Sequence, residues 1–268
     1  MKAQKEYDTS LPVYTKGEEI FNAVTHIVGG AFGIIFLIVG VIYAHWHCDG
    51  VGIFSMYIYG FCMIITYTMS AIYHFLRPNK AKKVFRIFDH CSIYLLIAGT
   101  YTPLCLITLA NAPAWGYTLF AIVWALSILG IVLNAINMYK WKVLSMILYI
   151  ALGWCIILAI YPLLQNMQLA GFWWLLAGGL CYTVGAVFYG FSKKVKYIHS
   201  IWHLFVLFGS ILQFVSILFY VVLAAWQKQK KKAFDVLSFL FNFLMCKFPK
   251  LLHFCVFFYL QLLPNDHQ

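Results

Sequence analysis

Two histidines stand four residues apart in the stretch KYIHSIWHLF, residues 196–205, at the start of a long apolar run. Residues four apart share one face of an α-helix, so His199 and His203 can present two ring nitrogens to one point. Ser70 and His74 have the same spacing near the end of another apolar run. Three imidazoles that leave a fourth position for water are the arrangement of a catalytic zinc site. The pattern therefore predicts a zinc site with His74, His199 and His203 as ligands.

An acid and a hydroxyl accompany these histidines. Asp89, in the stretch RIFDHCSIY, can hold the far nitrogen of a ligating histidine or act as a general base on water. Zinc lowers the pKa of a bound water to about 7, and the Ser70 hydroxyl can donate to a developing oxyanion. The alternative interpretation of the histidines is structural, because polar side chains also hydrogen-bond between membrane helices.

Other polar residues of the same regions are open to more than one interpretation. His26 and His90 are left ambiguous, and neighbouring residues on a helix point about 100° apart, so Asp89 and His90 are not both expected to face the site. Glu19 and Asn22 are interpreted as a network at a helix start, where a carboxylate is favoured.

The elements that must position these groups are apolar. Of 268 residues, 63% are hydrophobic and 10% are charged, whereas a soluble domain carries roughly 25% charged residues. Residues 1–19 are polar and predict no cleavable signal peptide. Apolar runs near the about 20 residues that a helix needs to cross a bilayer recur along the chain. They predict an all-α membrane protein with spans at about 20–46, 51–76, 88–109, 114–135, 143–164, 169–191 and 199–226.

The chain has a net charge of +11, and its basic residues are distributed unevenly among the loops between the predicted spans. The loops after the second, fourth and sixth predicted spans contain five, two and three lysines and arginines, and the loops that alternate with them contain none. Basic loops remain in the cytoplasm, so the N-terminus is expected inside and the basic residues are expected to meet anionic lipid heads. The excess of basic residues is therefore explained by the orientation of the protein in the membrane, which argues against a nucleic-acid partner.

This topology brings the unusual polar groups into one layer near the cytoplasmic face. The layer takes His74 from the end of the second span, Asp89 from the start of the third, and the histidine pair from the start of the seventh. A charged group in mid-membrane costs roughly 2.5–3.5 kcal/mol, so such groups tend to be functional.

The chain divides into a cytoplasmic segment at 1–19, a seven-helix membrane domain at 20–226, and a basic then hydrophobic tail at 227–268. For the tail, a re-entrant hairpin, interfacial helices and an interrupted eighth span all remain open. The eight cysteines form no C-x-x-C pair and are interpreted as small buried hydrophobic residues.

Four stretches in this order carry a family resemblance: EEIFNAVTH, SAIYH, FDHCSIYLLIAGTYTP and HSIWHLFVLFGSILQF. From residue 14 to about 226 the chain resembles hemolysin III-type proteins, a bacterial branch of the progestin and adipoQ receptor family. The resemblance implies seven helices and a zinc ion near the cytoplasmic side, held by His74, His199 and His203. It also implies that Asp89 contacts the water at the zinc and that Ser70 is the serine one turn before the metal histidine.

Three functions follow as expectations. The related alkaline ceramidases hydrolyse a lipid amide, which implies a zinc-dependent intramembrane hydrolase of lipid amides or esters. The branch name implies a pore-forming, cytolytic membrane protein, and the third alternative is a membrane sensor or receptor with structural zinc. Membrane lipids, including a lipid substrate, are the expected partners, and the bacterial plasma membrane is the expected location. The oligomeric state is left open.

Overall fold

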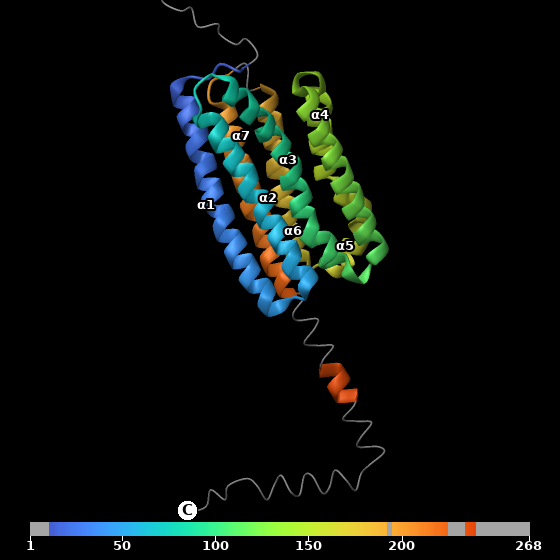
Figure 1. Ribbon diagram of the computed structural model, residues 1–268. Helices are drawn as coiled ribbons and strands as arrows, with labels where there is room; N and C mark the ends of the chain where they lie inside the picture. The colour runs from blue at the N-terminus through green and yellow to red at the C-terminus, as the bar shows by residue number, and fades with distance from the viewer. Residues whose placement is uncertain (1–10, 192–194, 225–233, 240–268) are drawn as a thin grey trace, which may run out of the picture. The chain divides into compact units, whose positions relative to one another are not determined.

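The computed structural model describes residues 11–191, 195–224 and 234–239, and every regular element in these ranges is a helix. Within the unit Met1–Ala225, long helices lie side by side in a bundle (Figure 1). The long helices are α1 (Lys16–His47), α2 (Gly50–Phe75), α3 (Lys80–Leu106), α4 (Pro113–Gly153), α6 (Leu169–Phe191) and α7 (Ile198–Ser216). The short ones are η1 (Thr108–Asn111), η2 (Cys155–Ala159), α5 (Ile160–Asn166) and the π-helix η3 (Ile217–Val222).

The described helices confirm an all-α, multi-pass membrane protein. Five segments are long and apolar enough to cross a membrane: Lys16–His47, Gly50–Phe75, Pro113–Asn166, Leu169–Gly190 and Ile198–Val222. The helix α3 is not among these five, and Pro113–Asn166 counts once. The count of seven spans therefore stays a prediction.

The long helix α4 folds back on itself at Asn137, whose backbone angles are φ −160° and ψ 87° (Figure 1). Across this break, the Ser145 hydroxyl donates to Asn134 Oδ1 at 2.6 Å, and Asn134 Nδ2 donates to the Tyr149 hydroxyl at 3.2 Å. Residues 134 and 145 would lie about 16 Å apart in a straight helix, so the two arms of α4 are antiparallel. This hairpin gives the segment room for both spans predicted at 114–135 and 143–164.

Side-chain caps set where three helices begin. Thr15, Asp49 and Asn79 each accept a hydrogen bond from a backbone N–H in the first turn of α1, α2 and α3, which satisfies groups that a helix start leaves unpaired. The predicted start of the third span at 88 was too late by eight residues, because the Asn79 cap starts α3 at Lys80. Most of the basic residues assigned to that loop therefore lie in the first two turns of α3.

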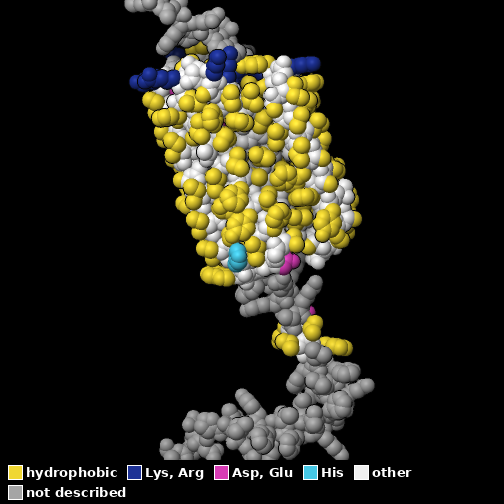
Figure 2. Space-filling view, in the orientation of Figure 1, with side chains coloured by type: hydrophobic (Ala, Val, Ile, Leu, Met, Phe, Trp, Pro, Cys, Tyr) yellow, Lys and Arg dark blue, Asp and Glu magenta, His cyan; other side chains and the backbone are white. Residues whose placement is uncertain are grey.

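The lysines and arginines gather at one end of the bundle on the face shown in Figure 2, and its sides are covered by apolar side chains. At the same end lie the start of α1 and the start of α7 (Figure 1). This arrangement is the one that the predicted topology requires, with basic residues at the cytoplasmic surface.

Close approach of α1 and α2 positions the region where the histidines lie. A Cβ on Gly29 would lie 2.3 Å from the ring of Tyr67, so only glycine lets the helices meet there. The Tyr67 hydroxyl donates to Ser210 Oγ at 2.7 Å, which ties α2 to α7 at the same level. The three helices are thus packed tightly below the predicted site.

Candidate metal centre

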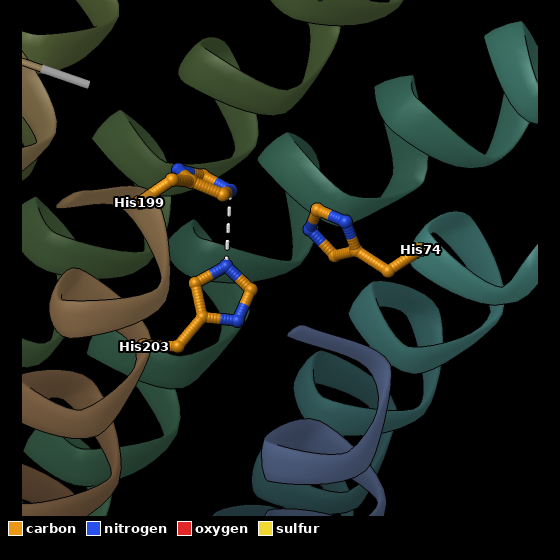
Figure 3. A group of neighbouring side chains, drawn as sticks. All are labelled: His74, His199 and His203. Carbon is orange, nitrogen blue, oxygen red and sulfur yellow. Dashed lines mark hydrogen bonds between the residues drawn. The ribbon is translucent and has the colours of Figure 1, made fainter. Parts of the chain in front are cut away.

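The three predicted ligands converge in the bundle. His74 lies in the last turn of α2, and His199 and His203 lie in the first two turns of α7. Their side chains are buried, and each offers a ring nitrogen within 4.8 Å of the others. Figure 3 shows the His74 ring turned towards the pair on α7. This group could hold a metal ion, as the spacing predicted, while the identity of the metal stays a prediction.

The donor atoms fit a metal. The Nε2 atoms of His199 and His203 lie 3.0 Å apart, and the Nε2 of His74 is buried with no hydrogen-bond partner among the described residues. The Nδ1 of His74 is 2.7 Å from Glu19 Oε2. Because a carboxylate accepts the proton on Nδ1, the lone pair of His74 is on Nε2, the nitrogen that is free to bind. Neutral imidazoles are good ligands for zinc, copper, iron and nickel.

A buried lysine completes the support of His74. The Lys82 ammonium, 2% exposed as a residue, donates to Glu19 Oε1 at 2.6 Å and to the Leu76 carbonyl at 2.9 Å. The chain of contacts Lys82–Glu19–His74 joins the first turns of α3 and α1 to the last turn of α2. It fixes the orientation of the Glu19 carboxylate and, through it, the ring of His74.

Glu19 lies in the first turn of α1, as expected of a residue at a helix start, but its carboxylate contacts His74 and Lys82 of other helices. Glu18 forms the capping network at the helix start, since its Oε2 accepts from the backbone N–H of Thr15 at 2.8 Å and the Thr15 hydroxyl caps the Glu18 N–H. The other carboxylate oxygen of Glu18 accepts from the backbone N–H of Tyr197 at 2.8 Å. Tyr197 has φ 60° and precedes α7, so Glu18 also holds the entry to the helix that carries two of the ligands.

Replacement of Glu19 by glutamine is expected to weaken metal affinity about 10- to 100-fold, as is usual when the outer partner of a ligating histidine is removed. The amide can still contact Lys82 less strongly, but it no longer holds the His74 proton as a carboxylate does. Competition against a calibrated chelator measures the affinity. Asp49→Asn also converts a carboxylate to an amide, at the end of α2 opposite to His74, and should leave the metal affinity unaltered. Equal affinity in both variants would remove Glu19 from the metal centre.

The predicted acid and hydroxyl lie beside the triad without joining it. Asp89 is buried, interacts electrostatically with His74 and lies close to Ser70. The Ser70 hydroxyl is buried, and within the described ranges no hydrogen bond is formed by it. Asp89 is not part of the group of ligand atoms that lie within 4.8 Å of one another. Asp89 therefore lies next to the triad but outside it.

His26 and His90, whose roles the sequence left ambiguous, differ in their surroundings. His90 has Nδ1 2.9 Å from the Arg86 carbonyl and Nε2 3.3 Å from the Tyr189 hydroxyl, and it lies outside the ligand group. His26 is buried edge-on against His203, with ring centroids 4.0 Å apart, and neither of its nitrogens has a hydrogen-bond partner in the part of the chain described. A fourth imidazole therefore stands directly against the triad.

The polar residues of the stretch EEIFNAVTH lie on one face of α1. Glu19, Asn22 and His26 follow one another at spacings of three and four residues, which places them on one side of a helix. Glu19 holds His74, Asn22 Oδ1 accepts from the Ser200 hydroxyl at 2.6 Å, and His26 packs on His203. The polar residues of this helix therefore position both ligand-bearing helices.

Tyr14 is the residue that sequence reasoning missed. It lies before α1 in a segment without regular secondary structure, and its ring stacks on His199 with centroids 5.0 Å apart and an interplanar angle of 18°. Burial raises the pKa of the Tyr14 phenol well above its usual value, so the hydroxyl stays protonated. No periodic pattern marks a residue outside a helix, so only the fold could reveal this contact.

A cavity of about 180 Å³ extends from the metal centre into the bundle. Tyr14, Asp89 and His199 line it near the basic end, and Tyr101 and Gln213 line it deeper. From His199 to Gln213, α7 rises about 21 Å at 1.5 Å per residue, which is two-thirds of the about 30 Å of a bilayer core. Much of the lining between these ends is apolar, with Ile93, Leu96, Ile97 and Val206 among the residues. The cavity is therefore long and mostly apolar.

Comparisons with known proteins agree with this architecture. A family model described as "Haemolysin-III related" matches residues 14–214. The protein "Hemolysin-3" of Bacillus cereus is 44% identical over 205 residues, which is 76% of this chain and 92% of that protein. The "Hemolysin-3 homolog" of Bacillus subtilis (strain 168) is 40% identical over 210 residues, 78% of this chain and 97% of that protein. The human "Monocyte to macrophage differentiation factor" is 27% identical over 210 residues, 75% and 83% of the two chains.

Proposed function

The chain belongs to the haemolysin-III-related family of integral membrane proteins, and from this we propose that it is a zinc-dependent intramembrane hydrolase of lipid amides or esters. The observation that carries the proposal is a buried three-histidine group at the head of a lipid-length cavity, with an acid and a hydroxyl beside it. We place the site near the cytoplasmic face, because it lies at the basic end of the bundle.

His74, His199 and His203 would hold the ion, and Glu19 would keep Nε2 of His74 directed at it. When bound, zinc supplies Lewis acidity, which polarises a carbonyl and makes water a better nucleophile at neutral pH. The apolar cavity would position the chain of the substrate so that its amide or ester group meets the polar head of the site.

Asp89 and Ser70 would handle the charge that develops. As the water oxygen bonds to the carbonyl carbon, the Asp89 carboxylate takes the proton that the water loses. The Ser70 hydroxyl donates to the oxyanion that forms on the carbonyl oxygen. Asp89 then passes its proton to the leaving nitrogen or oxygen as the bond to the carbon breaks. The products are a fatty acid and an amine or alcohol, and the carboxylate is restored.

The proposal is tested by metal removal. Purified full-length protein, analysed for its metal content, is incubated with a long-chain ceramide, a diacyl phospholipid and a monoacylglycerol, and released fatty acid is measured. We expect turnover of at least one class, loss of it after chelation, and recovery with Zn²⁺ but not with Mg²⁺, which prefers oxygen ligands. Protein that contains zinc and turns over none of the three classes would contradict a hydrolase.

A sensor with structural metal is the second candidate. The triad joins α2 to α7, and every ligand is buried, as in a clamp between helices. In that case chelation should lower the thermal unfolding temperature of the protein while no lipid is hydrolysed. The name hemolysin of the bacterial relatives suggests a cytolytic function instead, and dye leakage from liposomes that survives removal of the histidines would support it.

A further inference from the structure

His26 is a buried imidazole that the described residues do not satisfy. The residue is 3% exposed, and neither ring nitrogen has a hydrogen-bond partner in the part of the chain that the structure describes. A neutral imidazole carries one N–H donor and one acceptor nitrogen. In native proteins the great majority of buried polar atoms are hydrogen-bonded, because an unpaired one is costly. The ring of His26 is therefore suited to contact a ligand.

The surroundings of His26 place this contact beside the metal centre. The ring meets His203 edge-on, with centroids 4.0 Å apart, and it interacts electrostatically with His74 and Asp89. Tyr67 packs against it with ring centroids 5.2 Å apart. His26 is not one of the three histidines whose ligand nitrogens lie within 4.8 Å of one another. It is therefore a neighbour of the triad and not a fourth histidine ligand.

His26 also lines the cavity that reaches the metal centre, together with Asp89 and the triad member His199. These three residues come from α1, α3 and α7. Three histidine ligands leave a further position of a metal ion to water or to another small ligand. A ligand that enters through the cavity thus meets His26 and the triad together.

We infer that His26 donates a hydrogen bond to the small ligand at the open position of the metal. The inference rests on the metal centre of the proposed function, and it deepens that function by adding a residue that selects what binds there. Hydrogen bonds to charged acceptors are stronger than those to neutral ones, so the N–H of His26 favours an anionic ligand over a neutral one. The same contact favours the negative charge that develops on a carbonyl oxygen during hydrolysis.

Azide binding to cobalt-loaded protein tests the inference without turnover. Full-length protein in detergent is loaded with Co²⁺, whose visible absorption reports its ligands, and is titrated with sodium azide. His26→Leu removes both ring nitrogens and should weaken azide binding at least about tenfold, the ratio that corresponds to one charged hydrogen bond, while the cobalt content stays unchanged. His45→Leu is the control, since His45 is an exposed histidine of the same helix and should bind azide as the unsubstituted protein does.

Two further variants of His26 separate a hydrogen bond from packing. The side-chain amide of asparagine can place an N–H near the position of Nδ1, and that of glutamine near the position of Nε2. We expect one of His26→Asn and His26→Gln to recover part of the azide affinity, which identifies the nitrogen that donates. Recovery in neither variant would mean that His26 only fills space, and it would overturn the inference.

The other outcomes are equally decisive. Equal or tighter azide binding in His26→Leu would overturn the inference, and so would the absence of azide binding to the unsubstituted cobalt protein. Loss of cobalt from all three His26 variants would make His26 a support of the ion and refute the role inferred here. Equal azide affinities in a protein that hydrolyses lipid would refute only this inference. Azide binding that depends on His26 in a protein that hydrolyses no lipid would refute only the hydrolase.

Discussion

Replacing both His199 and His203 with alanine is expected to reduce the metal content of the purified protein from one ion per chain to nearly none. The two residues supply two of the three ring nitrogens that lie within 4.8 Å of one another, and a single remaining imidazole cannot hold an ion against a dilute chelator. Elemental analysis after purification measures the content, and circular dichroism shows whether the helices are retained.

The control is a double replacement of two histidines in the last turn of α1. His45 and His47 have ring nitrogens 2.9 Å and 2.8 Å from backbone carbonyls of the preceding turn, and they lie at the end of the helix opposite to Glu19. His45→Ala with His47→Ala removes the same number of imidazoles and should preserve the metal. If the ion is retained without His199 and His203, those imidazoles only stabilise helix packing and the metal centre is excluded.

Asp89→Asn is expected to lower lipid hydrolysis about 10²- to 10⁴-fold, the usual contribution of a general base, while metal content stays unchanged. Asparagine has nearly the same shape as aspartate and can accept a hydrogen bond, but it cannot take a proton from water at neutral pH. Asp89 is close to Ser70 and His74 but outside the ligand group, so the loss should affect turnover alone. Initial rates at saturating lipid and elemental analysis of the same preparation give the two values.

The combination of the two measurements separates the roles open to Asp89. Loss of metal together with turnover would make Asp89 a ligand or a support for one. Full turnover in Asp89→Asn would mean that another group takes the proton. Asp49→Asn, at the cap of α2, controls for the change of charge.

The sequence alone predicted the membrane bundle and the three histidines that meet inside it. In a bilayer every backbone polar group must be paired within the protein, and a helix does this within one segment, so an apolar run of sufficient length nearly dictates its own structure. The pairing of His199 with His203 follows from one turn of helix, which is local geometry. His74 could be added because alternating basic loops fix the direction of each span, and direction fixes which end of a helix meets which layer.

The tertiary structure decided what depends on helix rotation and on breaks in helices. Glu18 and Glu19 are adjacent and point about 100° apart, so only the packing of α1 shows that Glu19 meets His74 while Glu18 holds the start of α7. Tyr14 lies outside any helix, and no periodicity could place it on His199. The prediction for the tail at 227–268 lies outside the described residues except at 234–239, which are helical.

The cavity was beyond sequence reasoning for the same reason. Its lining comes from the segment before α1 and from several helices, and it includes both arms of α4, which meet only because the chain folds back at Asn137. Spacing along one helix predicts which residues share a face. Which faces then enclose a space is set by contacts between residues distant in the chain, whose geometry no local pattern encodes.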